Sequence, residues 1–203
     1  MDLFISNNVP QKLWDNMPIR NKHILGITSL WMIIPIINTH MSYLCGLLGS
    51  VCTASILFWY DPRQNSLLHK ADKYLSINFC LTLLAYTVID IINNNSSIIL
   101  YTSLSGSTLI LYNLSNFYFK IEKHNNQLIA HLLFRYSIFL WSYIIMVESK
   151  NVYHEIVIIS MGYLLNISEM ILLKSWDNYS YWNSCFVTSL LVMNTNLIKL
   201  YKS

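Results

Sequence analysis

Residues 127–147 read QLIAHLLFRYSIFLWSYIIMV, a stretch whose one permanently charged side chain is that of Arg135. A helix crosses the hydrocarbon core of a bilayer in about 20 predominantly apolar residues. The stretch therefore predicts a membrane-spanning helix. The whole chain is similarly apolar, because 54% of its residues are hydrophobic and only 11% are charged. A typical soluble domain carries about twice that share of charge.

Six further stretches have a similar length and character, so we predict an all-α, polytopic integral membrane protein with about seven transmembrane helices in one bundle. A polar N-terminal segment, 1–23, precedes a bundle at 24–201. The expected spans are 24–39, 43–60, 74–92, 98–119, 127–147, 156–174 and 184–201. We expect Pro35 to kink the first span, because proline lacks the N–H that a helix requires. Serine and threonine dilute the hydrophobicity of 98–119, so six spans are the alternative to seven.

The distribution of lysine and arginine predicts the orientation of this bundle. With seven spans, nine basic residues fall on the side of the N-terminus and three on the opposite side. The first group is Lys12, Arg20, Lys22, Arg63, Lys70, Lys73, Lys120, Lys123 and Lys174, and the second is Lys150, Lys199 and Lys202. Basic residues concentrate in cytoplasmic loops. We therefore expect a cytoplasmic N-terminus and an extracytoplasmic C-terminus, in a membrane that the pattern does not identify.

Composition also excludes several classes of function. The net charge is only +3 and no long basic run occurs, which argues against nucleic-acid binding. The five glycines form no phosphate-binding loop, and the four cysteines are not spaced as metal ligands. The expected partner is the lipid bilayer, with a small molecule or an ion as a candidate ligand. No motif identifies a cofactor or an oligomeric state.

Polar residues within the predicted spans give one candidate site. Ionisable side chains at bilayer depth are costly and usually face the bundle interior. Counted at 1.5 Å per residue, the polar residues of four helices lie level with one another on the cytoplasmic side. The predicted intramembrane polar cluster consists of His131, Arg135, Asn166, Glu169, Asn78 and Asn113. Two interpretations stay open: a buried Arg135–Glu169 ion pair that packs two helices, or a cavity that binds an ion, a lipid headgroup or a small substrate.

A second pair of polar residues lies just before the span 74–92. His69 and Asp72 are three residues apart, so on a helix they share a face and could bind a metal or relay a proton. Two ligands are too few to specify a metal, and a solvated helix start is the simpler interpretation.

From the membrane-spanning pattern and the polar cluster within it, we favour a non-enzymatic, transporter- or channel-like membrane protein. The alternative is an intramembrane metal-dependent lipid hydrolase.

Overall fold

The computed structural model describes residues 17–37, 39, 41–63, 66–94, 98–147 and 156–164. Every element within these residues is a helix. In chain order they are α1 (Ile19–Ile27), the 3-10 helix η1 (Thr28–Met32), α2 (Ile33–Ile37), α3 (Ser42–Tyr60), α4 (Leu67–Asn94), α5 (Ile98–Lys120) and α6 (His124–Met146). Residues 156–164 are also helical. The predicted all-α class is therefore confirmed.

Three of these helices are long and apolar enough to cross a membrane: Ser42–Tyr60, Leu67–Asn93 and His124–Met146. They support an integral membrane protein. The helix α5 has 23 residues, but it is not among the three, in keeping with the serine and threonine residues that dilute it. The second half of the predicted span 156–174 and the whole of 184–201 lie outside the described residues. Seven spans thus stay a prediction.

The first predicted span, 24–39, is a broken helix. Its α-helical geometry changes to 3-10 geometry over Thr28–Met32, directly before the short helix that contains Pro35. Proline cannot donate a backbone hydrogen bond and crowds the preceding turn. The hydroxyls of Thr28 and Ser29 add to this effect, because they bond back to the carbonyls of Ile24, at 2.8 Å, and Leu25, at 3.3 Å. Such bonds bend helices.

The helix α4 begins at Leu67, seven residues before the predicted start of its span at residue 74. The side chain of Ser66 accepts a hydrogen bond from the backbone N–H of His69 at 3.1 Å. Serine is a preferred helix N-cap for this reason. The residues His69 and Asp72, which were expected just before the span 74–92, therefore belong to the first turns of its helix.

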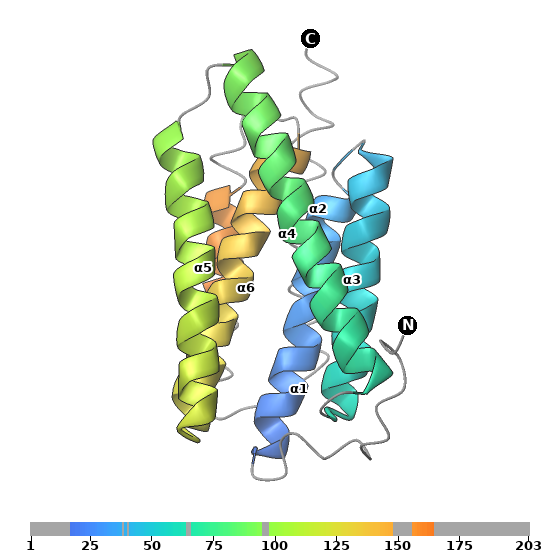
Figure 1. Ribbon diagram of the computed structural model, residues 1–203, viewed down its shortest axis with the longest axis vertical. Coiled ribbons are helices and arrows are strands. Elements are labelled where there is room, and N and C mark those ends of the chain that lie inside the picture. The colour runs from blue at the N-terminus through green and yellow to red at the C-terminus, as the bar shows by residue number, and fades with distance from the viewer. Residues whose placement is uncertain are drawn as a thin grey trace, which may run out of the picture.

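The helices form two groups, with α4 crossing between them (Figure 1). The antiparallel helices α5 and α6 pack along their whole lengths, and the broken segment α1–η1–α2 lies beside α3. The core is formed where the two groups meet. There the ring of Trp31 in η1 contacts Phe139 of α6 and Tyr163, with centroid distances of 6.5 and 5.2 Å. All three side chains are almost fully buried.

Within the described residues, all lysine and arginine residues except Arg135 lie toward one end of the structure. At this end α1, α4 and α6 begin, and α3 and α5 end (Figure 1). We call it the basic end, and its lysine and arginine residues are Arg20, Lys22, Arg63, Lys70, Lys73, Lys120 and Lys123. Among the described residues at the opposite end there is no lysine or arginine. The fold thus gathers at one end seven of the nine basic residues that were predicted to share a side of the membrane, and the other two, Lys12 and Lys174, lie outside the described residues.

Candidate functional site

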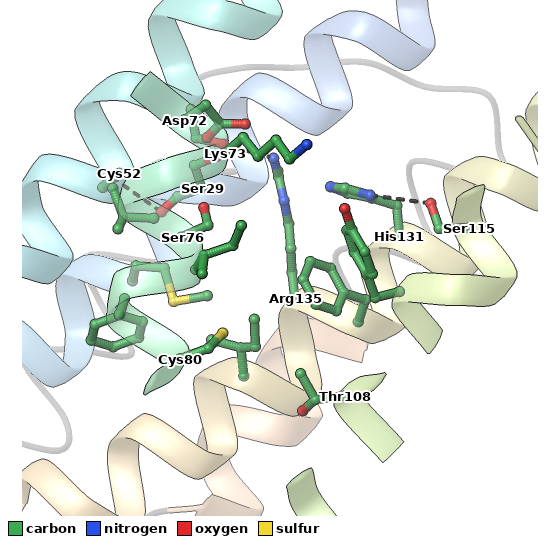
Figure 2. A pocket seen from close by; sticks show the side chains of 18 of the residues that line it. Ser29, Cys52, Asp72, Lys73, Ser76, Cys80, Thr108, Ser115, His131 and Arg135 are labelled. Carbon is green, nitrogen blue, oxygen red and sulfur yellow. Dashed lines mark hydrogen bonds between the residues drawn. The ribbon is translucent and has the colours of Figure 1, made fainter. Parts of the chain in front are cut away.

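A cavity of about 490 Å³ lies between α3 and α4 on one side and α5 and α6 on the other. Ligand pockets commonly have volumes of about 300–1,000 Å³. Figure 2 shows polar side chains from both sides pointing into this space, which we call the central cavity. The 3-10 helix η1 also contributes to its wall through Ser29 and Met32. Five elements therefore meet at one cavity.

Arg135 is the central charged group of this cavity. Its side chain extends from α6 and is only 6% exposed. The guanidinium donates hydrogen bonds to the carbonyl oxygen of Leu25, to Oγ1 of Thr28 at 2.6 Å and to Oγ of Ser55 at 3.0 Å. Leu25 and Thr28 lie at the C-terminal end of α1, where the helix dipole favours a cation. Arg135 therefore binds the point at which the first helix breaks.

Asp72 brings an acidic group from α4 to the same cavity. It lines the cavity wall together with Ser55 of α3, and its carboxylate and the Arg135 guanidinium attract each other electrostatically. A cation from α6 and an anion from α4 thus face one cavity. Figure 2 shows Asp72 and Lys73 near the end of the Arg135 side chain. The sequence interpretation had paired Arg135 with Glu169, which lies outside the described residues.

His131 lies one helical turn from Arg135 and faces α5. Its Nδ1 is 3.2 Å from the hydroxyl of Ser115, and its ring makes an edge contact with Trp59 at a centroid distance of 5.6 Å. One further turn toward the basic end, Gln127 also lines the cavity and is 1% exposed. Within the described part of the chain, its carboxamide oxygen has no hydrogen-bond partner. Buried polar atoms almost always have a hydrogen-bond partner, so a water molecule or a ligand group is expected to bond this oxygen.

The structure brings some of the predicted site residues together and separates others. His131, Arg135, His69 and Asp72 all line the central cavity. Asn78 is exposed and does not line it. Asn113 is also exposed and donates to the carbonyl of Leu109 at 2.8 Å, whereas Asn116 of the same helix faces the cavity. Asn166 and Glu169 lie outside the described residues.

Several cavity residues were not identified from the sequence. Ser29, Ser55, Lys73 and Ser115 have no distinctive spacing, so only the packing of their helices reveals them. Asp72 is different, because Ser66 is a recognisable N-cap. A helix that begins there places Asp72, Ser76, Phe79 and Leu83 on one face, and this signal predicts that Asp72 points inward.

No family model, curated protein or solved structure matches this chain. Over the residues described, no three histidine, cysteine or acidic side chains are grouped so that they could hold a metal ion. What the site offers chemically is therefore a set of hydrogen-bonding and charged groups around a largely apolar space.

Proposed function

We propose that this chain is a multi-pass membrane protein that binds a small charged ligand or a headgroup in the central cavity, as a transporter or channel component does. The observation that carries the proposal is the convergence of Arg135, Asp72, His131 and Lys73 on one cavity of ligand size. Intramembrane ionisable residues commonly mark the path or the site of a ligand. On this proposal the protein catalyses no reaction.

The broken first helix supports a transporter-like function. Many transporters bind substrate beside discontinuous membrane helices, whose free backbone groups and dipole ends face the site. Here Ser29, within the 3-10 segment, lines the central cavity, and Arg135 binds the adjacent helix end. Irregular backbone at membrane depth is tolerated where it lines such a cavity.

We further propose that the basic end faces the cytoplasm. The positive-inside rule supports this orientation. Asp72, Lys73 and Gln127 belong to the first two turns of their helices at the basic end, so the polar part of the cavity would lie on the cytoplasmic side. The N-terminus would also be cytoplasmic and, with seven spans, the C-terminus extracytoplasmic.

A ligand screen on the purified full-length chain tests the binding function. We expect at least one member of a panel of inorganic ions, small organic anions and lipids to raise the midpoint of thermal unfolding in detergent. The Lys73→Gln variant should lose much of that stabilisation. The matched control is Lys70→Gln, which changes the same residue type one turn away on α4 but outside the cavity wall. Equal responses from both variants would contradict the proposal.

An intramembrane metal-dependent lipid hydrolase is the second candidate. His69, Asp72 and His131 line the same cavity, although these three side chains are not grouped closely enough to hold a metal ion between them. Metal analysis of the purified protein distinguishes the two functions. Stoichiometric zinc that is lost in His69→Ala or His131→Ala would support the hydrolase, and zinc that is unchanged in both variants would argue against it.

A further inference from the structure

We infer that the ligand of the central cavity is a membrane lipid with an anionic, hydroxyl-bearing headgroup, and that it enters sideways from the bilayer between α4 and α5. This inference rests on the proposed function, because it names the ligand and the route for the same cavity. Three features of the structure support it: the shape of the opening, the order of polar and apolar residues along the cavity, and the groups at its polar end.

The opening lies where α4 and α5 separate. Near the end opposite the basic end, the Tyr101 hydroxyl of α5 donates to the Asp90 carboxylate of α4 at 2.6 Å. From there the two helices diverge toward the basic end (Figure 1). Leu81 of α4 and Leu109 of α5 both line the central cavity, yet they are 61% and 64% exposed. At these two residues the rim is therefore apolar and faces the side of the bundle, where lipid is the solvent. Nearer the basic end, Lys73 of α4 and Asn116 of α5 are also exposed and line the cavity.

The polarity of the cavity changes with depth in the order that a lipid of the same leaflet would require. Lys73 and Asp72 lie near the basic end, and Cys80 lies about two turns further along α4. Figure 2 shows the same separation, with Asp72 and Lys73 near the guanidinium end of the Arg135 side chain and Cys80 near its other end. Beyond Cys80 the wall includes the apolar residues Leu84 and Ile138. The hydroxyl of Thr108 also lies there, but it already bonds the carbonyl of Leu104 at 2.8 Å. A headgroup would fit the first region and an acyl chain the second.

The polar groups indicate the class of headgroup. The side chains of charged type around the space are the basic Arg135 and Lys73 and the acidic Asp72. Because basic groups outnumber acidic ones, the lining favours a phosphate group. The buried carboxamide oxygen of Gln127 can accept a hydrogen bond from a hydroxyl group. Phosphatidylglycerol combines both chemical groups and serves as the probe.

The test uses the full-length chain in phosphatidylcholine nanodiscs that contain phosphatidylglycerol with a photoactivatable acyl chain. Mass spectrometry locates the labelled residues after illumination. We expect label on the cavity residues of α4 and α5, including Leu81 and Leu109. Unlabelled phosphatidylglycerol should reduce the labelling of these residues by competition, and added phosphatidylcholine should not. Val88 and Ile92 are the internal control, because they are exposed on α4 but lie outside the cavity wall. Their labelling should respond equally to both competitors.

Two matched variants test the charge recognition. Lys73→Gln should raise the concentration of phosphatidylglycerol needed for half-maximal competition by about fivefold, the loss expected for one lysine near an anionic headgroup. Lys70→Gln should leave it unchanged. The lateral lipid route is wrong if neither variant changes the competition. It is also wrong if Leu81 and Leu109 are protected from label, for example by another segment of the chain.

A water-soluble probe separates this inference from the proposed function. In nanodiscs of phosphatidylcholine alone, glycerol phosphate carries the same headgroup chemistry without an acyl chain. We expect it to give no thermal stabilisation at concentrations where phosphatidylglycerol stabilises fully. Equal stabilisation by glycerol phosphate would overturn the lipid and its route but keep a ligand-binding cavity. If neither probe stabilises the protein and no phosphatidylglycerol-specific label appears, this inference is wrong, and the ligand screen decides separately whether the cavity binds anything.

Discussion

At the scale of single residues, Arg135 explains how this chain holds a cation at bilayer depth. Removing a guanidinium from water is costly unless its donors are satisfied. Here the carbonyl of Leu25 and the hydroxyls of Thr28 and Ser55 accept its hydrogen bonds, and the Asp72 carboxyl group of α4 interacts with its charge. The side chain thereby connects α6 with α1, α3 and α4. The structural role of Arg135 is compatible with a ligand in the cavity, because its positive charge can attract an anionic ligand as well as Asp72.

We expect Arg135→Leu to lower the free energy of unfolding by about 3 kcal/mol, because it removes hydrogen bonds to three partners and leaves Asp72 without the cation. Unfolding of the purified protein in mixed micelles of increasing sodium dodecyl sulfate measures the change. The control is Arg63→Leu, since Arg63 pairs with Asp61 at 2.8 Å at the exposed surface. A similar loss in both variants would show that the buried position of Arg135 confers no special stability.

A second residue pair joins α6 to α4. The indole Nε1 of Trp141 donates to Oγ1 of Thr87 at 2.8 Å, and both side chains are buried. We expect Trp141→Phe and Thr87→Val each to cost about 1 kcal/mol, as interhelical hydrogen bonds in membranes do. The double variant should cost less than the sum of the two, which the same unfolding assay can determine. Strict additivity would mean that the bond adds no stability.

At the scale of secondary structure, the ends and breaks of the helices follow from local chemistry. The first helix breaks next to Pro35, and Ser66 begins α4. The helix α5 ends in a tight turn in which Glu122 has a φ of 57°. The N–H of Lys123 there bonds the carbonyl of Tyr118 at 3.0 Å. This is the pattern by which helices terminate at a left-handed residue, a position that glycine usually occupies.

We expect Glu122→Gly to stabilise the protein by up to about 1 kcal/mol, because glycine adopts a positive φ without the steric cost that other residues bear. The change should appear as a higher midpoint of thermal unfolding. Glu122→Ala is the control, since it removes the same charge but retains a β-carbon. Equal gains from both substitutions would attribute the effect to charge and not to backbone conformation.

At the scale of the whole molecule, the apolar outer surface supports a location in a bilayer, and the basic end supports the proposed orientation. Large apolar side chains such as Leu81, Val88 and Ile110 are exposed on the outside of the helices. In water such a surface would cause aggregation, whereas in lipid it is favourable. The opening between α4 and α5 gives the cavity a direct route to the same lipid.

Cysteine accessibility in cells tests this orientation. In a background that lacks the four native cysteines, Glu122→Cys at the basic end should resist a membrane-impermeant maleimide until the membrane is permeabilised. Ile37→Cys, which is exposed at the opposite end, should react at once. The reverse pattern would invert the orientation, and reaction of both residues in intact cells would argue against a membrane between them. Tags at the two termini separately test the odd number of spans.

The helical class, the location of most helices and the position of His131 and Arg135 on an inward face could all be predicted from the printed residues. These properties depend on composition and on helical periodicity, which are local. The identity of the groups around Arg135 could not be predicted from the sequence, because it depends on which helix faces meet. Ser55 and Asp72 come close to a residue far along the chain only after α3, α4 and α6 pack. The central cavity and its lateral opening also depend on tertiary packing. They arise because α4 and α5 are joined by a hydrogen bond at one end and diverge toward the other.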